Sequence, residues 1–244
     1  MNALLVRVGA DLSEGGGGWN GPANTATGEF VYVPIPESRP LHPGLHKPYS
    51  ALHPDLSRFG SSLPKHLANQ TMHLDPDFSH LTYGDQGTRA LQISCKLGCG
   101  DLLVFYAALK DVKPRPHLIY AIIGLYVVER IERACLVAES QWDENAHTRR
   151  VLSPTADDIV IRARPGISGR LEKYLPIGSF RASVVMPNKR PCYRVDPNTL
   201  AAWGGLDISD GFLQRSARLP KFRDPGRFCD WFQSQKVQLV NRNN

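Results

Sequence analysis

The chain has 244 residues, 42% of them hydrophobic, so it is long enough to bury a substantial core. Its longest apolar run, residues 118–128, falls short of the roughly 18 residues that a membrane-spanning helix needs, so we expect no membrane protein of that kind. The N-terminus lacks the basic start and cleavage site of a signal peptide, and the five cysteines show no paired framework. We therefore expect a cytoplasmic protein.

The net charge of +6 is unevenly distributed. Residues 151–244 contain 15 basic and 8 acidic side chains, whereas the rest of the chain holds 14 and 15. A one-sided basic excess favours a polyanion partner such as nucleic acid, although ordinary solvated charge explains it equally well. Cys95 and Cys99 have no second Cys or His pair at zinc-finger spacing, so we expect no zinc site at these two cysteines.

The first half of the chain is rich in predicted strands. Residues 3–8 form an apolar run typical of a buried strand, and residues 9–21 form a glycine-rich loop. A second short strand is predicted over residues 30–33, where Pro34 stops it. Residues 38–70, rich in Pro, His and Ser, indicate a long, partly helical excursion.

Two longer apolar segments follow and predict the centre of the fold. Residues 102–106 and 118–128 lack polar alternation, as expected of strands covered on both faces. Gly124 interrupts the second strand and indicates a bulge or sharp bend. A short polar, Pro-containing segment separates the two strands. Together they predict a strongly bent hairpin of the kind that builds a small β-barrel.

The second half mixes strands and helices. We predict a strand over residues 158–163, a short helix over 168–174, a helical turn from Pro197, and a closing helix from Pro225 to Gln235. Asp224 is suited to cap that last helix. Its inner face carries Phe228, Trp231 and Phe232. The fold class is therefore α+β, a bent antiparallel barrel with peripheral helices and long loops in one domain over residues 1–244.

An acidic cluster is the strongest candidate for chemistry. In an extended segment His73, Asp75 and Asp77 fall on one face, where they could hold a divalent metal or perform acid–base catalysis. The alternative is an Asx-type turn at Asp75 and Asp77 that His73 caps. Asp85 adds a nearby carboxylate.

Two further segments could bind a nucleotide. Trp19 beside Asn20 suits a base pocket, in which the indole stacks and the amide reads the edge; the alternative is a surface turn. The glycine-rich loop lacks the Lys and Ser/Thr of a P-loop. Arg215, Arg218 and Lys221 form a candidate phosphate-contacting strip, or else a half-buried strand with solvated arginines.

The central hairpin supports a first resemblance. G-D-L-L-V-F-Y (residues 100–106) followed by I-I-G-L-Y-V-V (residues 122–128) resembles the hairpin of EVE-type domains of the PUA-like superfamily. The later order of strand, basic segment and closing helix is similar. This resemblance covers roughly the second half of the chain. It implies a small barrel whose pocket accepts a base, often a modified one flipped out of nucleic acid.

A fuller resemblance spans nearly the whole chain. It is to the third type of nucleotide-modification-associated domain. The motifs that carry it are L-L-V-R-V-G-A-D (4–11), W-N-G-P (19–22), F-V-Y-V-P-I-P-E (30–37), H-L-D-P-D-F (73–78), L-T-Y-G-D (81–85), G-D-L-L-V-F-Y (100–106) and L-Q-R-S-A-R-L-P (213–220). The resemblance implies base modification or recognition of modified bases. The glycine run at 15–18 and the His-rich stretch at 42–66 look like local elaborations.

Three functions remain open at this point. The first is a module that binds a base or nucleotide in the barrel through the nucleotide-binding set Trp19, Asn20, Tyr83, Arg215, Arg218 and Lys221. The second is an enzyme on nucleotides or DNA bases with the catalytic set Asp11, His73, Asp75, Asp77 and Asp85. The third is a non-catalytic scaffold. The expected partners are nucleic acid, with DNA favoured, or free nucleotide, together with proteins of a base-modification system. The sequence identifies no cofactor.

Overall fold

The computed structural model describes residues 1–113, 118–185, 191–213 and 217–244, and it has the expected α+β composition. The strands are β1 (Ala3–Arg7), β2 (Gly21–Ala23), β3 (Ile35–Pro36), β4 (Met72–His73), β5 (Thr82–Asp85), β6 (Leu102–Asp111), β7 (Leu118–Arg133), β8 (Ile159–Ala163), β9 (Gly169–Val185), β10 (Pro191–Val195), β11 (Phe212–Leu213) and β12 (Leu239–Val240). The α-helices are α1 (His53–Arg58), α2 (Gly87–Lys96), α3 (Pro197–Ala202) and α4 (Pro225–Ser234). Short 3-10 turns lie at Tyr49–Leu52, Ala134–Leu136, Glu139–Glu144 and Ser209–Gly211.

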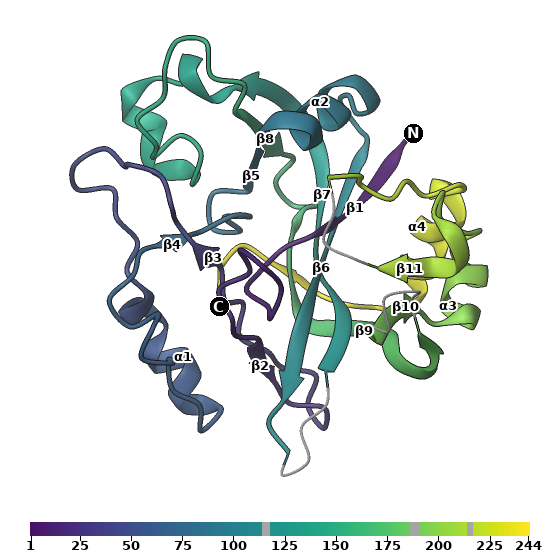
Figure 1. Cartoon of the computed structure of the whole chain (residues 1–244). Helices are drawn as coiled ribbons and strands as arrows, with labels where there is room; N and C mark the ends of the chain where they lie inside the picture. Colours follow the sequence, from purple (N-terminus) through teal and green to yellow (C-terminus); the bar gives the residue numbers. More distant parts are fainter. Residues whose placement is uncertain (114–117, 186–190, 214–216) are drawn as a thin grey trace.

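A ten-stranded sheet, strongly curled into a half-barrel, forms the frame of the molecule (Figure 1). Its main path runs β1-β6-β7-β9-β10-β11, while β3 and β4 form a separate two-stranded sheet. The sheet is mixed rather than wholly antiparallel as predicted, because β1 and β2 both pair with β6 in parallel. Both parallel strands, β1 and β2, belong to the N-terminal segment. They pair along the edge of β6 that does not face β7.

The predicted bent hairpin is confirmed as β6 and β7. Their register shifts where Phe105 and Tyr106 face Gly124 and Ile122, so Ile123 is the extra residue of a bulge. The glycine has a second role here, because a Cβ at position 124 would lie 2.4 Å from the Phe78 ring. The bend thus brings the strand backbone against the loop that follows β4.

Replacing Gly124 with alanine should therefore lower the free energy of unfolding by about 1–3 kcal/mol, the usual cost of overpacking a core. The matched control is Gly98→Ala, because a Cβ there meets nothing within 4 Å. That control should stay within about 0.5 kcal/mol of the unsubstituted protein. Urea unfolding of both variants tests the packing, and equal stabilities would contradict it.

Each face of the sheet buries its own core. On one face the aromatic rings of Phe78, Tyr83, Phe105 and Tyr126 pack together under α2. The opposite face is covered by α3 and α4 (Figure 1). Phe228 and Trp231 of α4 pack against Trp203, which directly follows α3. Asp224 caps α4 by accepting a hydrogen bond from the Arg227 amide, as predicted. The alternation of side chains along β1 and β6 feeds both cores.

Two predicted elements are wrong and one helix was not predicted. Residues 30–33 form no strand: Phe30 makes only an isolated bridge to Ala23 of β2, and the Tyr32 amide donates to the Asn244 side chain. The helix predicted over 168–174 is the start of β9, where pairing with β7 and β12 outweighs local preference. Helix α2 lacks a side-chain cap of its own; Asp157 accepts the Gly87 amide instead. Within the described ranges no helix is long and apolar enough to cross a membrane.

Candidate functional site

The site begins at the two-residue ladder between β3 and β4. His73 pairs with Ile35, and Glu37 follows two residues later on the same side of the strand. This alternation brings Glu37 Oε2 to 2.6 Å from His73 Nδ1. Since an ionised carboxylate only accepts hydrogen bonds, the imidazole donates from Nδ1 and leaves its Nε2 lone pair available.

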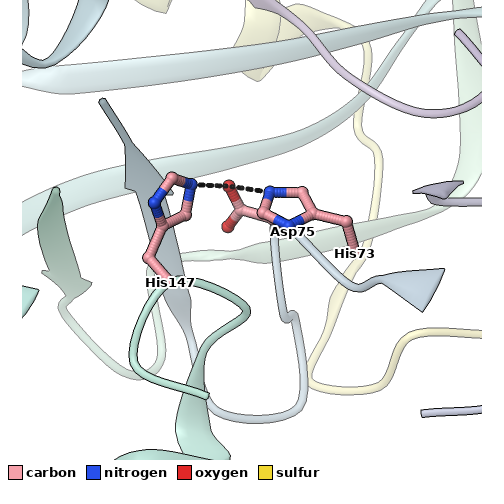
Figure 2. A group of neighbouring side chains, drawn as sticks. All are labelled: His73, Asp75 and His147. Atoms are coloured by element: carbon pink, nitrogen blue, oxygen red, sulfur yellow. Dashed lines mark ion pairs between the residues drawn. The ribbon is translucent and has the colours of Figure 1, made fainter. Parts of the chain in front are cut away.

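Asp75 lies two residues further along, and its two oxygens have different environments. Oδ1 accepts hydrogen bonds from the Gly84 amide at 2.8 Å and from Asn145 Nδ2 at 2.9 Å. Oδ2 faces two imidazoles, with His73 Nε2 and His147 Nε2 each 3.9 Å away (Figure 2). The hydrogen bonds to Oδ1 therefore orient Oδ2 toward the histidines.

His147 approaches Asp75 from the opposite side, on the segment between β7 and β8 (Figure 2). Its Nδ1 lies 2.6 Å from Asp158 Oδ1, the same arrangement that Glu37 makes with His73. The Asn145 side-chain oxygen accepts the His147 amide at 2.8 Å and fixes the turn. Gly84 permits this approach, because a Cβ there would lie 2.3 Å from the imidazole.

One guanidinium ties the two halves of the site together. Arg150 reaches Glu37 Oε1 at 3.1 Å and Asp158 Oδ1 at 3.1 Å. These two carboxylates are the hydrogen-bond acceptors of the two histidines, so a single side chain positions both. All of these groups are buried.

The ionisation of the site follows from burial and pairing. Burial opposes charge on Glu37, but hydrogen bonds from His73 and Arg150 outweigh it and lower its pKa to about 2. Burial lowers the pKa of His73 to about 4 and also depresses that of His147. Burial raises the pKa of Asp75 well above its usual range. Both imidazoles are thus neutral at pH 7.

The histidine face of this cluster forms part of the wall of a cavity of about 400 Å³, which we call the histidine cavity. It lies within the roughly 300–1,000 Å³ typical of small-molecule sites. Asp85 also borders it and pairs with Arg89 at 2.9 Å. The Tyr83 hydroxyl donates to Asp85, while its ring packs on Phe105 and is only 3% exposed. Arg7 and two glycines of the glycine-rich loop, Gly15 and Gly17, also line the cavity.

The other two members of the predicted catalytic set have structural partners. Asp11 pairs with Arg7 at 2.9 Å and accepts the Ser13 amide, which shapes the glycine-rich loop. Asp77 pairs with the buried Arg149 at 2.8 Å and accepts the amide of Ser79, as in an Asx-type turn. The structure therefore brings together His73, Asp75 and Asp85 at the histidine cavity and directs Asp77 elsewhere.

The predicted nucleotide-binding residues are dispersed. Trp19 and Asn20 line a different cavity of about 340 Å³ with Phe59 and Lys110, and the Asn20 amide donates to Ala108 O at 2.9 Å. This cavity is the Trp19 cavity below. Arg218 is exposed and pairs with Asp207. The backbone of Lys221 forms an isolated antiparallel β-bridge with Leu4 in β1. Arg215 lies outside the described residues.

Sequence reasoning missed half of the cluster. Asn145, His147 and Arg150 come from residues 141–151, which the sequence presents only as a polar connection, and Asp158 is the first residue of the predicted strand 158–163. All four side chains are buried. The closely spaced N-A-H-T-R-R of residues 145–150 was the available signal. Nothing local links it to His73, since the contact joins residues more than 70 positions apart.

Comparison with known proteins identifies a family but no characterised relative. No curated protein and no solved structure matches the chain, so the PUA-like resemblance stays a prediction. The family model described as "Nucleotide modification associated domain 3" matches residues 2–188, which include the whole histidine cluster. The chain therefore belongs to the nucleotide modification associated domain 3 family.

Proposed function

We propose that this protein acts within a nucleotide-modification system as an enzyme that binds a nucleotide, or a base extruded from nucleic acid, in the histidine cavity. The observation that carries the proposal is the convergence of His73, Asp75, His147 and Asp85 on one cavity wall. These residues come from β4, the following loop, β5 and the segment before β8. A module that only reads a base has no need for two buried imidazoles whose Nε2 atoms face the same carboxylate.

The chemistry of the wall suits proton transfer at a bound base. The Nδ1 atoms are held by Glu37 and Asp158, so each Nε2 is presented in a fixed orientation as a proton acceptor or ligand. Arg7 and Arg89 border the cavity with side chains 10% and 21% exposed. Their guanidinium groups are suited to contact a phosphate of a bound nucleotide. The family assignment supports nucleotides or nucleic-acid bases as the substrate class of this proposal.

Two substitutions distinguish the histidine cavity from the Trp19 cavity as the place where the ligand binds. His147→Gln should abolish turnover, because it removes an imidazole of the wall, and should change nucleotide affinity by less than roughly 10-fold, a factor worth about 1.4 kcal/mol. Trp19→Ala should leave binding and turnover unchanged, since Trp19 lines the other cavity. Binding is measured by titration calorimetry with deoxynucleoside monophosphates and modified-base oligonucleotides, and products by mass spectrometry.

The opposite result in the two variants would assign the ligand to the Trp19 cavity. If Trp19→Ala weakened binding and His147→Gln did not affect binding or turnover, the ligand would occupy the Trp19 cavity. If the protein bound members of the panel but converted none of them, the catalytic part of the proposal would fail and the binding function would stand alone.

A further inference from the structure

The histidine cluster has the features of a metal centre, and we propose that His73, Asp75 and His147 bind one divalent first-row transition-metal ion. The three side chains offer one ligand atom each, and these atoms all lie within 4.8 Å of one another. All three residues are buried. The inference rests on this arrangement alone and holds whether or not the substrate is a nucleotide.

The choice of ligand atoms is already made by the surrounding hydrogen bonds. In each histidine Nδ1 is engaged by a carboxylate, Glu37 or Asp158, which directs the free Nε2 lone pair at Asp75 Oδ2. Carboxylate–histidine–metal arrangements of this kind are the usual outer shell of a metal site, where they fix the tautomer and the ring orientation. The site contains two such carboxylate–histidine pairs, and both direct Nε2 at the same carboxylate oxygen. Side-chain packing alone does not require this arrangement.

The aspartate and arginine support the same interpretation. Asp75 Oδ1 is saturated by the Gly84 amide and Asn145, so only Oδ2 faces the imidazoles. Arg150 forms ion pairs with Glu37 and Asp158, and among the described residues it forms none with Asp75. A cation between the three ligand atoms would stabilise the ionised form of Asp75, which burial disfavours.

The donor atoms would move closer together around an ion, since they now lie within 4.8 Å of one another and two of the separations are 3.9 Å. Metal–nitrogen and metal–oxygen bonds of about 2.0–2.2 Å in a tetrahedral site separate the donor atoms by roughly 3.3 Å. The two 3.9 Å separations to Asp75 Oδ2 would therefore shorten by about half an ångström. Because the residues line the histidine cavity, the remaining coordination positions can accept water or substrate.

The donor set also selects the class of metal. Two imidazoles with one carboxylate suit Zn²⁺ or Fe²⁺, whereas Mg²⁺ and Ca²⁺ prefer all-oxygen sites. Exposed Cys95 and Cys99 are a potential source of unrelated binding. Both are therefore replaced by serine in the protein used for the test.

The test is a titration of the chelator-treated full chain with Co²⁺, followed by its visible absorption, with Zn²⁺ and Mg²⁺ as competitors and no nucleotide present. We expect one Co²⁺ per chain, displaced by Zn²⁺ but not by millimolar-range Mg²⁺. His73→Ala and His147→Ala should each lose more than about 100-fold in affinity, beyond the roughly 10–100-fold expected of the positioning variant Asp158→Asn. His53→Ala, an exposed histidine in α1, is the matched control and should bind normally.

Several outcomes would overturn the proposal. These are no Co²⁺ uptake above that of the His73→Ala/His147→Ala protein, equal losses in the His53→Ala control, or displacement by Mg²⁺ as readily as by Zn²⁺. If circular dichroism shows that His73→Ala or His147→Ala is unfolded without metal, His147→Gln is used in its place. Failure of nucleotide binding in the separate experiment would leave this result untouched.

Discussion

Replacing Arg150 with methionine should lower the free energy of unfolding at pH 7 by about 3–5 kcal/mol, the range for removing one partner of a buried ion pair. The guanidinium is 8% exposed and contacts both Glu37 and Asp158. Without it, two buried carboxylates keep their charge and lose their common counter-ion. The variant should also lose the orientation of both histidines, and with it turnover. Urea unfolding measures the stability.

The effect should depend on pH in a defined direction. Glu37 has a pKa of about 2 in the folded protein against an ordinary value of 4.5, so its ionised form stabilises the fold fully above pH 4.5. That contribution is lost as the pH falls toward 2. The Arg150→Met variant has less of it to lose, so the gap between the two proteins should narrow on acidification. A gap that widened would contradict this account.

The matched control for Arg150 is Arg130→Met. Arg130 is 51% exposed, and its partners Glu129 and Glu132 remain in contact with water. Exposed ion pairs contribute about 0–1 kcal/mol, so this variant should be close to the unsubstituted protein at every pH. Similar losses in both variants would mean that Arg150 acts as an ordinary surface charge.

Replacing Phe78 with alanine should cost about 3–5 kcal/mol of unfolding free energy, as for other fully buried aromatic rings. Phe78 makes edge contacts with Tyr32, Phe105 and Tyr126 at centroid distances of 5.6–5.9 Å. It also follows Asp77 in the loop that carries Asp75. The cavity left behind would loosen the support of this loop as well as the core.

A double-mutant cycle with Gly124 separates the contact from general damage. In the Phe78→Ala background the ring that a Cβ at position 124 would meet is gone. Gly124→Ala should then cost clearly less than when Phe78 is present, and the remaining cost comes from Gly169 O, 3.0 Å from the added Cβ. Additive losses would show that the two positions do not interact through the ring.

The elements that could be predicted from the sequence are those whose signal is local. Apolar runs identified β1, β6, β7 and β8, and Asp224 with Pro225 identified α4. The sequence predicts a helix at the start of β9, because the pairing of that segment with β12 is set by residues about 70 positions away. The parallel entry of β1 beside β6 has no local signature at all.

The same distinction applies to the site. His73, Asp75 and Asp85 could be proposed because their spacing along one segment is visible in the sequence. His147 and Arg150 could not be connected to them, because the link is a contact between distant buried side chains. Trp19 shows the opposite case. Trp19 and Asn20 are residue types that suit a base pocket, but the fold places them at the Trp19 cavity and not at the histidine cavity.

The ladder between β3 and β4 joins only two residue pairs, and it stands outside the ten-stranded sheet. Such a ladder can open at a small free-energy cost while the large sheet stays intact. Amide hydrogens along this ladder, such as that of Glu37, which bonds to Thr71 O at 2.9 Å, should then exchange with solvent faster than those of β6. A ligand in the histidine cavity should slow this exchange. The exchange rate of these amides would then report whether the cavity is occupied.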